Sequence, residues 1–330
     1  MFNVELIGTG SCIPEKVVTN DDLAKIVDTS DEWITSRTGI KERRISTGET
    51  TTELAVGAAR SALESARISA EDLDLIIVAT LTPDDYLPST ACQVQKHIGA
   101  DNAACFDLNA ACTGFIYGLT VASQFIRTGM YKTALVIGAE ELSKITDWTD
   151  RTTCVLFADG AGAAVLQRGE QQGIISEIIG SDGNKGDCLT CPALPPRNYF
   201  IRDDSTKESR SEYVYMNGRE VYKFAVTVMP ECILKTLEGT GISLSDIDHI
   251  IPHQANLRII DAAAKKLNLD ASKFYVNLPR FGNTSGASIP IALDEMAKAN
   301  RFKKGDLIIL VGFGGGLTYG AMLIKWTMGE

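Results

Sequence analysis

Apolar residues along this chain follow two alternating patterns. In the first, they recur at helical spacing, as over 52–66 and 221–237, which predicts amphipathic helices. In the second, short runs of Ile, Val and Leu form continuous apolar stretches, which is typical of strands buried on both faces. These runs lie at 75–79, 134–138, 250–252 and 307–311. The alternation predicts an α/β protein whose sheets are covered by helices on both faces.

The chain also repeats itself. The segment Asp72-Leu-Asp-Leu-Ile-Ile is similar to Asp246-Ile-Asp-His-Ile-Ile, and Leu135-Val-Ile-Gly is similar to Ile309-Leu-Val-Gly. Both pairs are separated by the same 174 residues. A constant offset predicts two similar halves, although short α/β segments can also look alike by chance.

We place the two halves at 1–173 and 174–330, related by a pseudo-two-fold axis. Cys112-Thr-Gly has a counterpart in Asn283-Thr-Ser-Gly, 171 residues later, and each precedes a predicted helix with a buried start. If the two helix starts converge where the halves meet, Cys112 and Asn283 lie near each other. The N-terminal half then carries a nucleophile and the C-terminal half carries polar donors.

Composition narrows the classes of function. The 330 residues are 45% hydrophobic and 22% charged, as in ordinary globular proteins, and the net charge of -10 argues against nucleic acid or an anionic membrane as a partner. No run reaches about 18 consecutive apolar residues, so we expect no membrane span. The first residues lack a basic region followed by an apolar run, so we expect a cytoplasmic protein without a secretory signal.

Eight cysteines are present, mostly within apolar runs, which favours free buried thiols over disulfides. Cys188 and Cys191 form a C-x-x-C motif, but no second pair and no nearby histidine completes a zinc site. We therefore expect no metal and no cofactor.

Three separate segments could carry chemistry: Ala-Ala-Cys112-Thr-Gly, Pro-His253-Gln-Ala-Asn and Gly-Asn283-Thr-Ser-Gly. A cysteine at a helix N-terminus is expected to favour the thiolate, which is a nucleophile. A histidine after a strand and an asparagine in a loop can act as base or hydrogen-bond donors. Taken singly, each could instead be structural: an inert thiol, a satisfied histidine, or a turn and N-cap residue.

A glycine-rich segment, Gly312-Phe-Gly-Gly-Gly316, follows a predicted strand. A phosphate-binding loop would continue into a helix with Lys-Ser/Thr, whereas 317–325 reads as another strand. Glycines here can instead bring backbone amides close to a carbonyl oxygen, as in an oxyanion hole.

Taken together, the motifs are similar to one family nearly end to end. The matching segments are Ile7-Gly-Thr-Gly10, 28–39, 88–93, 110–112, 157–164, 252–260, 282–286 and 313–316. The chain resembles the β-ketoacyl-acyl-carrier-protein synthase III family of the thiolase-like superfamily. The resemblance implies a thiolase-like fold with a layered αβαβα core. It also implies an acyltransferase that initiates fatty-acid biosynthesis by decarboxylative Claisen condensation of an acyl-CoA primer with malonyl-acyl-carrier protein.

Roles for individual residues also follow from the resemblance. It implies a catalytic triad of Cys112, which would hold the acyl group, with His253 and Asn283, which would stabilise the enolate. The backbone amides of Cys112 and Gly315 would form an oxyanion hole. Phe313 would pack near Cys112 and exclude water.

For the substrates, the resemblance implies a CoA thioester whose adenine lies between Trp33 and Arg151. The residues implied to bind CoA or line the acyl pocket are Trp33, Arg37, Arg151, Phe157, Gly218, Asn256, Phe313 and Leu87. Leu87 would reach across a homodimer into the partner's acyl pocket. Because the acetyl-specific branch has Phe there, the smaller Leu predicts tolerance of primers beyond acetyl.

An acidic carrier protein needs a local basic patch on this acidic chain. Arg258 and Lys265 are seven residues apart on one predicted helix and therefore share a face. With Lys266 and Lys223 they are the expected docking patch, although a solvated helix face looks the same.

Rival functions remain at this point. A secondary-metabolite acyltransferase or condensing enzyme of the same family would carry the same cysteine. A biosynthetic thiolase needs a second cysteine near the C-terminal glycine segment, and none follows Cys232. A non-enzymatic binding protein would not need the nucleophile and donors. The polar segment 198–210 is expected to be a surface loop.

Overall fold

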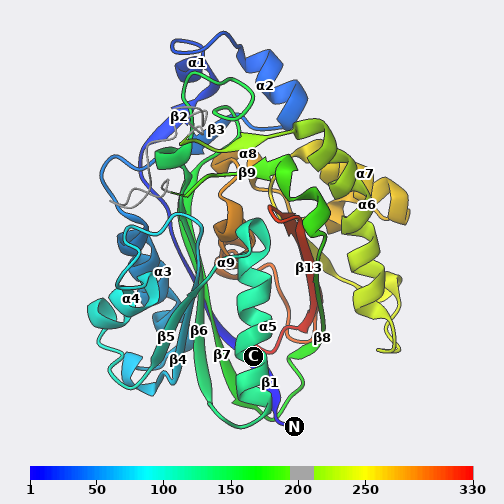
Figure 1. Cartoon of the computed structure of the whole chain (residues 1–330). Helices are drawn as coiled ribbons and strands as arrows, with labels where there is room; N and C mark the ends of the chain where they lie inside the picture. Colours follow the sequence, from blue (N-terminus) through cyan, green and yellow to red (C-terminus); the bar gives the residue numbers. More distant parts are fainter. Residues whose placement is uncertain (194–211, 330) are drawn as a thin grey trace.

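The architecture is that of two sheets stacked between helices (Figure 1). The computed structural model describes residues 1–193 and 212–329, so the loop expected at 198–210 lies outside the described residues. One sheet has the order β1-β7-β6-β4-β5 and the other β11-β12-β13-β8. The first contains β1 (Asn3–Cys12), β4 (Leu75–Ala79), β5 (Ala104–Leu108), β6 (Thr133–Glu141) and β7 (Asp159–Gly169). The second contains β8 (Ile174–Ser181), β11 (His249–Pro252), β12 (Leu307–Gly314) and β13 (Thr318–Lys325).

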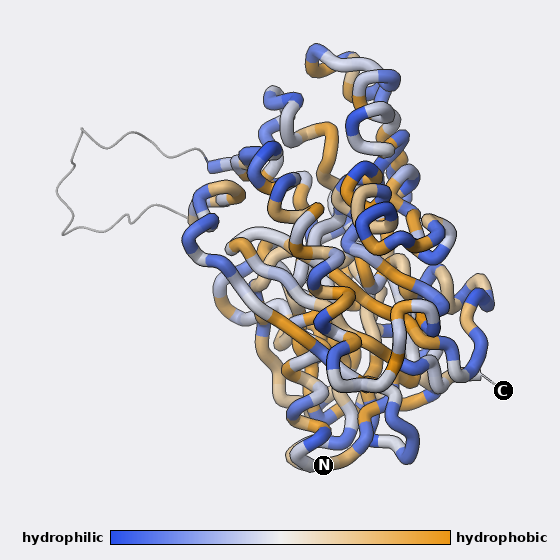
Figure 2. The backbone as a smooth tube through the Cα atoms, turned by 90° about the vertical axis from the view of Figure 1, so that its right-hand side faces the viewer, coloured by the Kyte–Doolittle hydropathy of each residue, from blue (hydrophilic) through white to orange (hydrophobic). Residues whose placement is uncertain are grey.

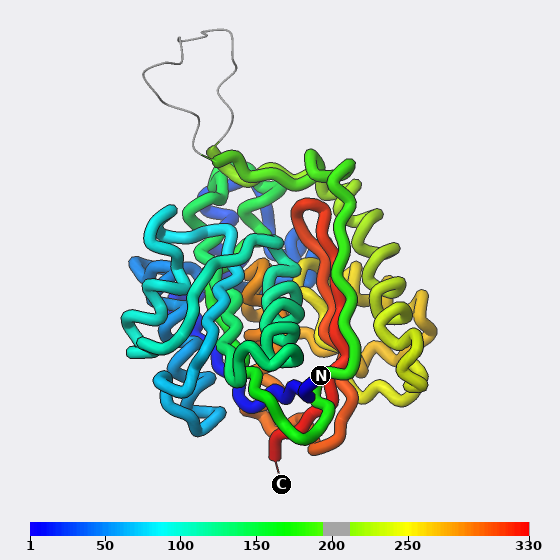
Figure 3. Tube along the Cα trace, turned by 60° about the horizontal axis from the view of Figure 1, so that its bottom comes forward, coloured from blue at the N-terminus to red at the C-terminus, as the bar shows by residue number. Residues whose placement is uncertain are grey.

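Six main helices form three layers around the sheets, as Figures 1 and 3 show. The outer face of the first sheet is covered by α3 (Thr51–Ala66) and α4 (Thr90–Ile98). The outer face of the second is covered by α6 (Gly218–Leu237) and α7 (Leu257–Leu267). Between the sheets lie α5 (Gly114–Arg127) and α9 (Ser288–Lys298). The expected α/β fold with an αβαβα core is confirmed.

The central layer explains why the helix after Cys112 is so apolar. Residues such as Phe115 and Leu119 of α5 are buried against both sheets, because the helix has a sheet on each side. Figure 2 shows the same distribution, with hydrophobic segments concentrated inside and hydrophilic residues in the outer turns. The four apolar runs singled out as strands are β4, β6, β11 and β12, three of them longer than the pattern indicated.

A smaller layer of short elements covers one end of the sandwich, at the top of Figure 1. Its core includes Ile34, Ile40, Val155 and Leu278. The elements are β2 (Val17–Thr19), α1 (Asn20–Leu23), α2 (Asp31–Thr38), β3 (Glu42–Arg44) and α8 (Leu278–Phe281). A separate pair of short strands, β9 (Leu189–Thr190) and β10 (Tyr215–Met216), lies near the same end.

The turns that precede the two central helices, α5 and α9, have the same backbone conformation. Ala111 and Ser285, which are 174 residues apart, both adopt left-handed backbone conformations, with φ of 46° and 47°. The N–H of Ala111 donates to Asn109 Oδ1 at 3.2 Å, and that of Ser285 donates to Asn283 Oδ1 at 2.9 Å. Asn283 therefore corresponds to Asn109, and the offset of 171 that paired it with Cys112 was wrong by three residues.

All strands of the first sheet lie before residue 170 in the chain, and all strands of the second lie from Ile174 onward. The division into halves at 1–173 and 174–330 stays a prediction. Among the described residues, no helix combines the length and hydrophobicity needed to cross a bilayer.

Candidate active site

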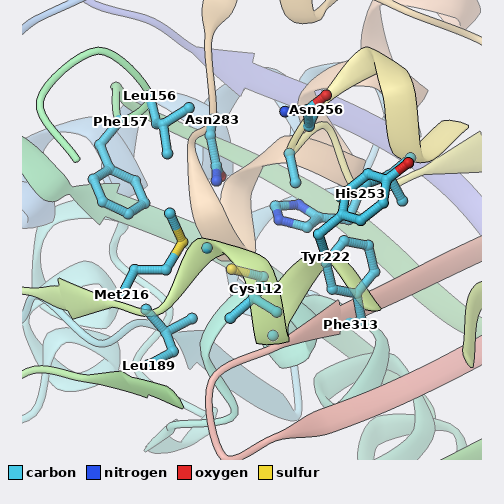
Figure 4. Close-up of a pocket in the computed structure, with 15 residues that line it drawn as sticks. Cys112, Leu156, Phe157, Leu189, Met216, Tyr222, His253, Asn256, Asn283 and Phe313 are labelled. Carbon is cyan, nitrogen blue, oxygen red and sulfur yellow. The ribbon is translucent and has the colours of Figure 1, made fainter. Parts of the chain in front are cut away.

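One cavity of about 140 Å³ is lined by residues from all three segments that the sequence analysis identified as candidate sites. Cys112, His253 and Asn283 all line it, and Figure 4 shows their side chains converging on the same space. Four further residues expected at the site also line it: Phe157, Gly218, Asn256 and Phe313.

Cys112 lies in η2 (Ala111–Thr113), a single tight turn before α5, and its side chain is buried. A Cβ atom placed on Gly314 would be 2.8 Å from the Cys112 nitrogen, so β12 can pass this close only because position 314 is glycine. Burial raises the pKa of the Cys112 thiol to about 12, although the Ser285 hydroxyl and the backbone amides of Cys112 and Gly315 oppose the rise. Burial therefore opposes the thiolate that the helix N-terminus was expected to favour.

His253 follows β11, and its backbone N–H donates to the Val311 carbonyl at 2.8 Å. Its Nδ1 lies 2.7 Å from Ser288 Oγ, and that oxygen also accepts the Gln254 N–H at 3.2 Å. Burial lowers the pKa of His253 to about 3, so the imidazole is neutral at pH 7. With Nδ1 engaged by Ser288, Nε2 is the ring nitrogen left for a substrate.

Asn283 is held next to Phe157 by a short parallel bridge. Its N–H donates to the Leu156 carbonyl at 2.9 Å, and its own carbonyl accepts the Ala158 N–H at 3.0 Å. Since the side-chain oxygen accepts the Ser285 N–H, the amide Nδ2 is the end left to donate into the cavity.

A larger cleft of about 910 Å³ reaches Cys112 as well, and its walls include Phe157, Leu189, Ser285 and Gly315. Because the amides of Cys112 and Gly315 both approach Sγ, an oxygen bonded next to that sulfur would lie close to two fixed donors. The Phe313 ring packs edge-on against the His253 imidazole, with centroids 5.5 Å apart, and forms an apolar wall.

Trp33, Arg37 and Arg151 form a cluster outside both cavities. The guanidinium carbons of Arg37 and Arg151 lie 5.8 and 5.4 Å from the Trp33 ring centroid. Arg37 is tied to the site, because Asn256 Nδ2 donates to its carbonyl at 3.0 Å. A planar ring between two others needs about 7 Å, so Arg151 and Trp33 must separate before an adenine can enter. Besides this contact with Trp33, Arg151 donates to the Asp28 carbonyl at 2.9 Å and pairs with the Asp28 carboxylate at 3.4 Å.

The remaining predicted residues lie on the surface. Leu87 is 88% exposed and lines neither cavity of its own chain. Arg258, Lys265 and Lys266 are exposed on α7. Lys223 is exposed on α6, where it pairs with Glu220 at 2.6 Å.

Sequence reasoning missed several residues of the site. Ser288 orients His253 from five positions beyond Asn283, and only the repeated serines of this segment could have suggested it. Leu189, Met216 and Tyr222 line the cavity from β9, β10 and α6, and as ordinary apolar residues they gave no signal. Among the described residues, no group of three or more His, Cys, Asp and Glu side chains is arranged to hold a metal ion.

Comparisons with known proteins agree over the whole chain. Residues 106–183 match the family model for 3-oxoacyl-[acyl-carrier-protein (ACP)] synthase III, and residues 237–326 match the model for its C-terminal part. The chain is 60% identical over 327 residues to β-ketoacyl-[acyl-carrier-protein] synthase III of Clostridium acetobutylicum, covering 99% of this chain and 100% of that relative.

Two solved structures are equally close in fold. The 3-oxoacyl-[acyl-carrier-protein] synthase III of Aquifex aeolicus has a TM-score of 0.91 at 49% identity, covering 98% of this chain and 100% of the other. The priming β-ketosynthase of the R1128 polyketide pathway also has a TM-score of 0.91, but at 33% identity, covering 99% and 97%.

The fold, with a thiol, an imidazole and an amide around one cavity, defines a condensing enzyme of the thiolase-like class. The 60% identity to the Clostridium acetobutylicum synthase, over the full length of both chains, then identifies the family within this class. The chain belongs to the β-ketoacyl-acyl-carrier-protein synthase III family, acyltransferases that catalyse the initiating condensation of fatty-acid synthesis. The resemblance drawn from the motifs is thereby confirmed.

Proposed function

We propose that this enzyme condenses an acyl-CoA primer with malonyl-acyl-carrier protein through an acyl group on Cys112. The observation that carries the proposal is the convergence of Cys112, His253 and Asn283 on one buried cavity. A thiol supplies the nucleophile, and two neutral donors supply hydrogen bonds where enolate charge develops. The CoA thioester is a substrate, so the chemistry needs no further cofactor.

Each group has a defined part in the two half-reactions. The amides of Cys112 and Gly315 stabilise the oxyanion that forms when Sγ adds to the primer carbonyl. After CoA leaves, His253 Nε2–H and Asn283 Nδ2–H donate to the malonyl thioester oxygen while carbon dioxide departs. The resulting carbanion attacks the acyl carbon on Cys112. The apolar wall at Phe313 limits water and hence hydrolysis of the intermediate.

The CoA moiety is placed along a path from the surface to the cavity. Trp33 and Arg151 take the adenine once they separate, and Arg37 faces the phosphates. Asn256 and Gly218 border the pantetheine arm, and the link from Asn256 to the Arg37 carbonyl joins this path to the cavity. Phe157 borders the acyl group.

A homodimer is the proposed assembly. Tyr86 and Leu87 expose 72% and 88% of their surface on one loop, which is unusual for large apolar side chains on neighbouring positions. A second copy would cover them, and Leu87 would then enter the partner's acyl pocket. We place the enzyme in the cytoplasm, where its thioester substrates are made.

Intact-mass analysis tests the function directly. The protein is incubated with acetyl-CoA and isobutyryl-CoA together, followed by malonyl-carrier protein, with Cys112→Ala as the control. We expect both acyl adducts on the wild type, none on the variant, and loss of the adducts as β-ketoacyl-carrier protein forms. A stable adduct that malonyl-carrier protein leaves unchanged would instead support acyl transfer to another acceptor. An acetyl adduct alone would contradict the inference from Leu87.

The docking patch gives a second prediction. Arg258→Glu reverses one charge on the exposed face of α7, and we expect KM for malonyl-carrier protein to rise about tenfold, with acyl-CoA transfer to Cys112 unchanged. Lys304→Glu is the matched control, because Lys304 lies in the loop before β12, at the opposite strand end from the site. Equal KM for both variants would contradict docking at α7.

A further inference from the structure

Two threonine hydroxyls that the mechanism above does not use lie where the turn of Cys112 meets the glycine segment. Thr113, directly after Cys112 in η2, is completely buried, and Thr318 is the first residue of β13. Thr113 Oγ1 donates to Thr318 Oγ1 at 2.8 Å, although 205 positions separate the two residues in the sequence. A buried hydroxyl needs a hydrogen-bond partner, and Thr113 finds one in a remote segment.

The two hydroxyls connect the backbones on either side of them. Thr113 Oγ1 lies 2.7 Å from the Ala110 carbonyl oxygen. Thr318 Oγ1 lies 3.2 Å from the same oxygen and 3.0 Å from the Gly315 carbonyl oxygen. Each hydroxyl has one proton, so Thr113 shares its proton between Ala110 and Thr318, and Thr318 shares its own between the two carbonyls. The peptide at Gly315 is therefore tied to the turn that carries Cys112.

The segment tied in this way cannot fix its own position. Residues 314–316 are three glycines, which have wide backbone freedom and no side chains to pack. A Cβ on Gly315 would be 3.4 Å from the Ala111 Cβ, so the two segments run close together. On the other side, Leu317 and Asp182 exchange backbone hydrogen bonds of 3.1 and 2.8 Å. The threonine pair holds the segment from the side of Cys112.

The position of Gly315 matters because its amide is one of the two donors proposed for the oxyanion. Such a donor acts only if it lies about 2.7–3.1 Å from the place where the charged oxygen forms. A displacement of about 1 Å can lower a rate by about 100-fold. A small shift of the glycine segment would therefore be felt in catalysis.

We propose that Thr113 and Thr318 are positioning residues that hold the Gly315 amide beside Cys112 as part of the oxyanion hole. Thr113 lines neither cavity and Thr318 borders only the larger one, so both act through Gly315. The hole stabilises a transition state, so losing the link lowers the rate of acylation and leaves KM for acetyl-CoA nearly unchanged. The inference rests on the proposed function.

Two substitutions separate the hydroxyl of Thr113 from its packing. Thr113→Val keeps the branched shape, including the methyl group that faces Gly312, and removes the hydroxyl. Thr113→Ser keeps the hydroxyl and removes that methyl group. Thr236→Val is the matched control, because Thr236 is a buried threonine on α6 whose hydroxyl donates to the Cys232 carbonyl at 2.8 Å and which lines neither cavity.

The test follows acylation of Cys112 by acetyl-CoA labelled with carbon-13 at the carbonyl, using rapid quenching and intact mass. Infrared spectroscopy of the acylated enzyme then gives the stretching frequency of the labelled carbonyl, which falls when donors polarise it. We expect Thr113→Val to slow acylation about 10- to 100-fold and to raise this frequency toward that of a free thioester. Thr113→Ser and Thr236→Val should keep the wild-type rate and frequency.

Thr318→Val tests the same link from its other end, and it keeps the test decisive if Thr113→Val does not fold. It should cause a loss of similar size. The double variant should lose less than the product of the two single losses, because the two hydroxyls form one link. Losses that multiply would contradict a shared link.

The result also separates this inference from the proposed function. A wild type that forms no acyl-Cys112 contradicts the proposed function, and this inference falls with it. If the wild type is acylated and both valine variants keep its rate and carbonyl frequency, the threonine pair does not position the amide. The inference is equally overturned if Thr113→Ser is as slow as Thr113→Val, or if the rate falls while the frequency stays unchanged, since a merely structural role would have these effects.

Discussion

Replacing His253 with alanine should slow condensation by about 100- to 1,000-fold, which is typical for the loss of one donor to a developing oxyanion. The neutral imidazole can act on the malonyl thioester only as a donor, because its pKa of about 3 leaves it uncharged throughout the working range. Asn283→Ala removes the second donor to the same oxygen and should cause a loss of similar size. The measurement is β-ketoacyl-carrier protein formation by enzyme that has first been fully acylated.

Two comparisons make this prediction specific. Acylation of Cys112 should change far less than condensation in both variants, because in the proposed mechanism acylation uses the amides of Cys112 and Gly315. The double variant should lose less than the product of the two single losses, since both donors serve one oxygen. A condensation rate that follows a histidine titration between pH 6 and 8 would contradict a neutral donor. Equal loss in both half-reactions would assign His253 to activation of the thiol instead.

Sequence patterns predicted the parts of the fold that depend on local periodicity. Runs such as 75–79 form strands that are buried on both faces of a sheet. Such a strand has no polar side, so an unbroken run of apolar residues predicts it. The segment 112–127 is apolar nearly all round, which predicts a buried helix, and the structure has the buried helix α5 at Gly114–Arg127. The three loops with Cys112, His253 and Asn283 could be recognised because each carries a nucleophilic or hydrogen-bonding side chain in a loop that leads into a predicted helix.

The features that sequence patterns could not predict depend on contacts between segments far apart in the chain. The repeat was found from its strands, but the equivalence of Ala111 and Ser285 becomes visible only through their shared backbone conformation. The effect of burial on the Cys112 thiol could not be predicted, because the helix dipole can be read from local sequence and the cost of burial cannot. The position of the buried Glu140 near Cys112 could not be predicted either, because the two residues come together only in the folded chain.

Glu140→Gln should stabilise the protein at pH 8 by about 3 kcal/mol. Folding raises the pKa of Glu140 from 4.5 to about 7, and each unit corresponds to about 1.4 kcal/mol. The folded protein holds this proton more tightly than the unfolded chain, so the carboxyl group lowers stability as pH rises from about 4.5 to 7. Above 7 the penalty is complete, and a neutral glutamine of similar shape avoids it.

Urea unfolding at pH 8 and pH 4.5 measures this effect, and the lower pH is an internal control because both side chains are then neutral in the folded protein. We expect a gain at pH 8 and nearly equal free energies of unfolding at pH 4.5. A variant that is less stable at both values would mean that the hydrogen bonds from Thr82 and Leu81 need a carboxyl group rather than an amide at this position. A gain at pH 8 alone would show that the cost comes from burying the charged carboxylate, which has no ion pair to a cation among the described residues.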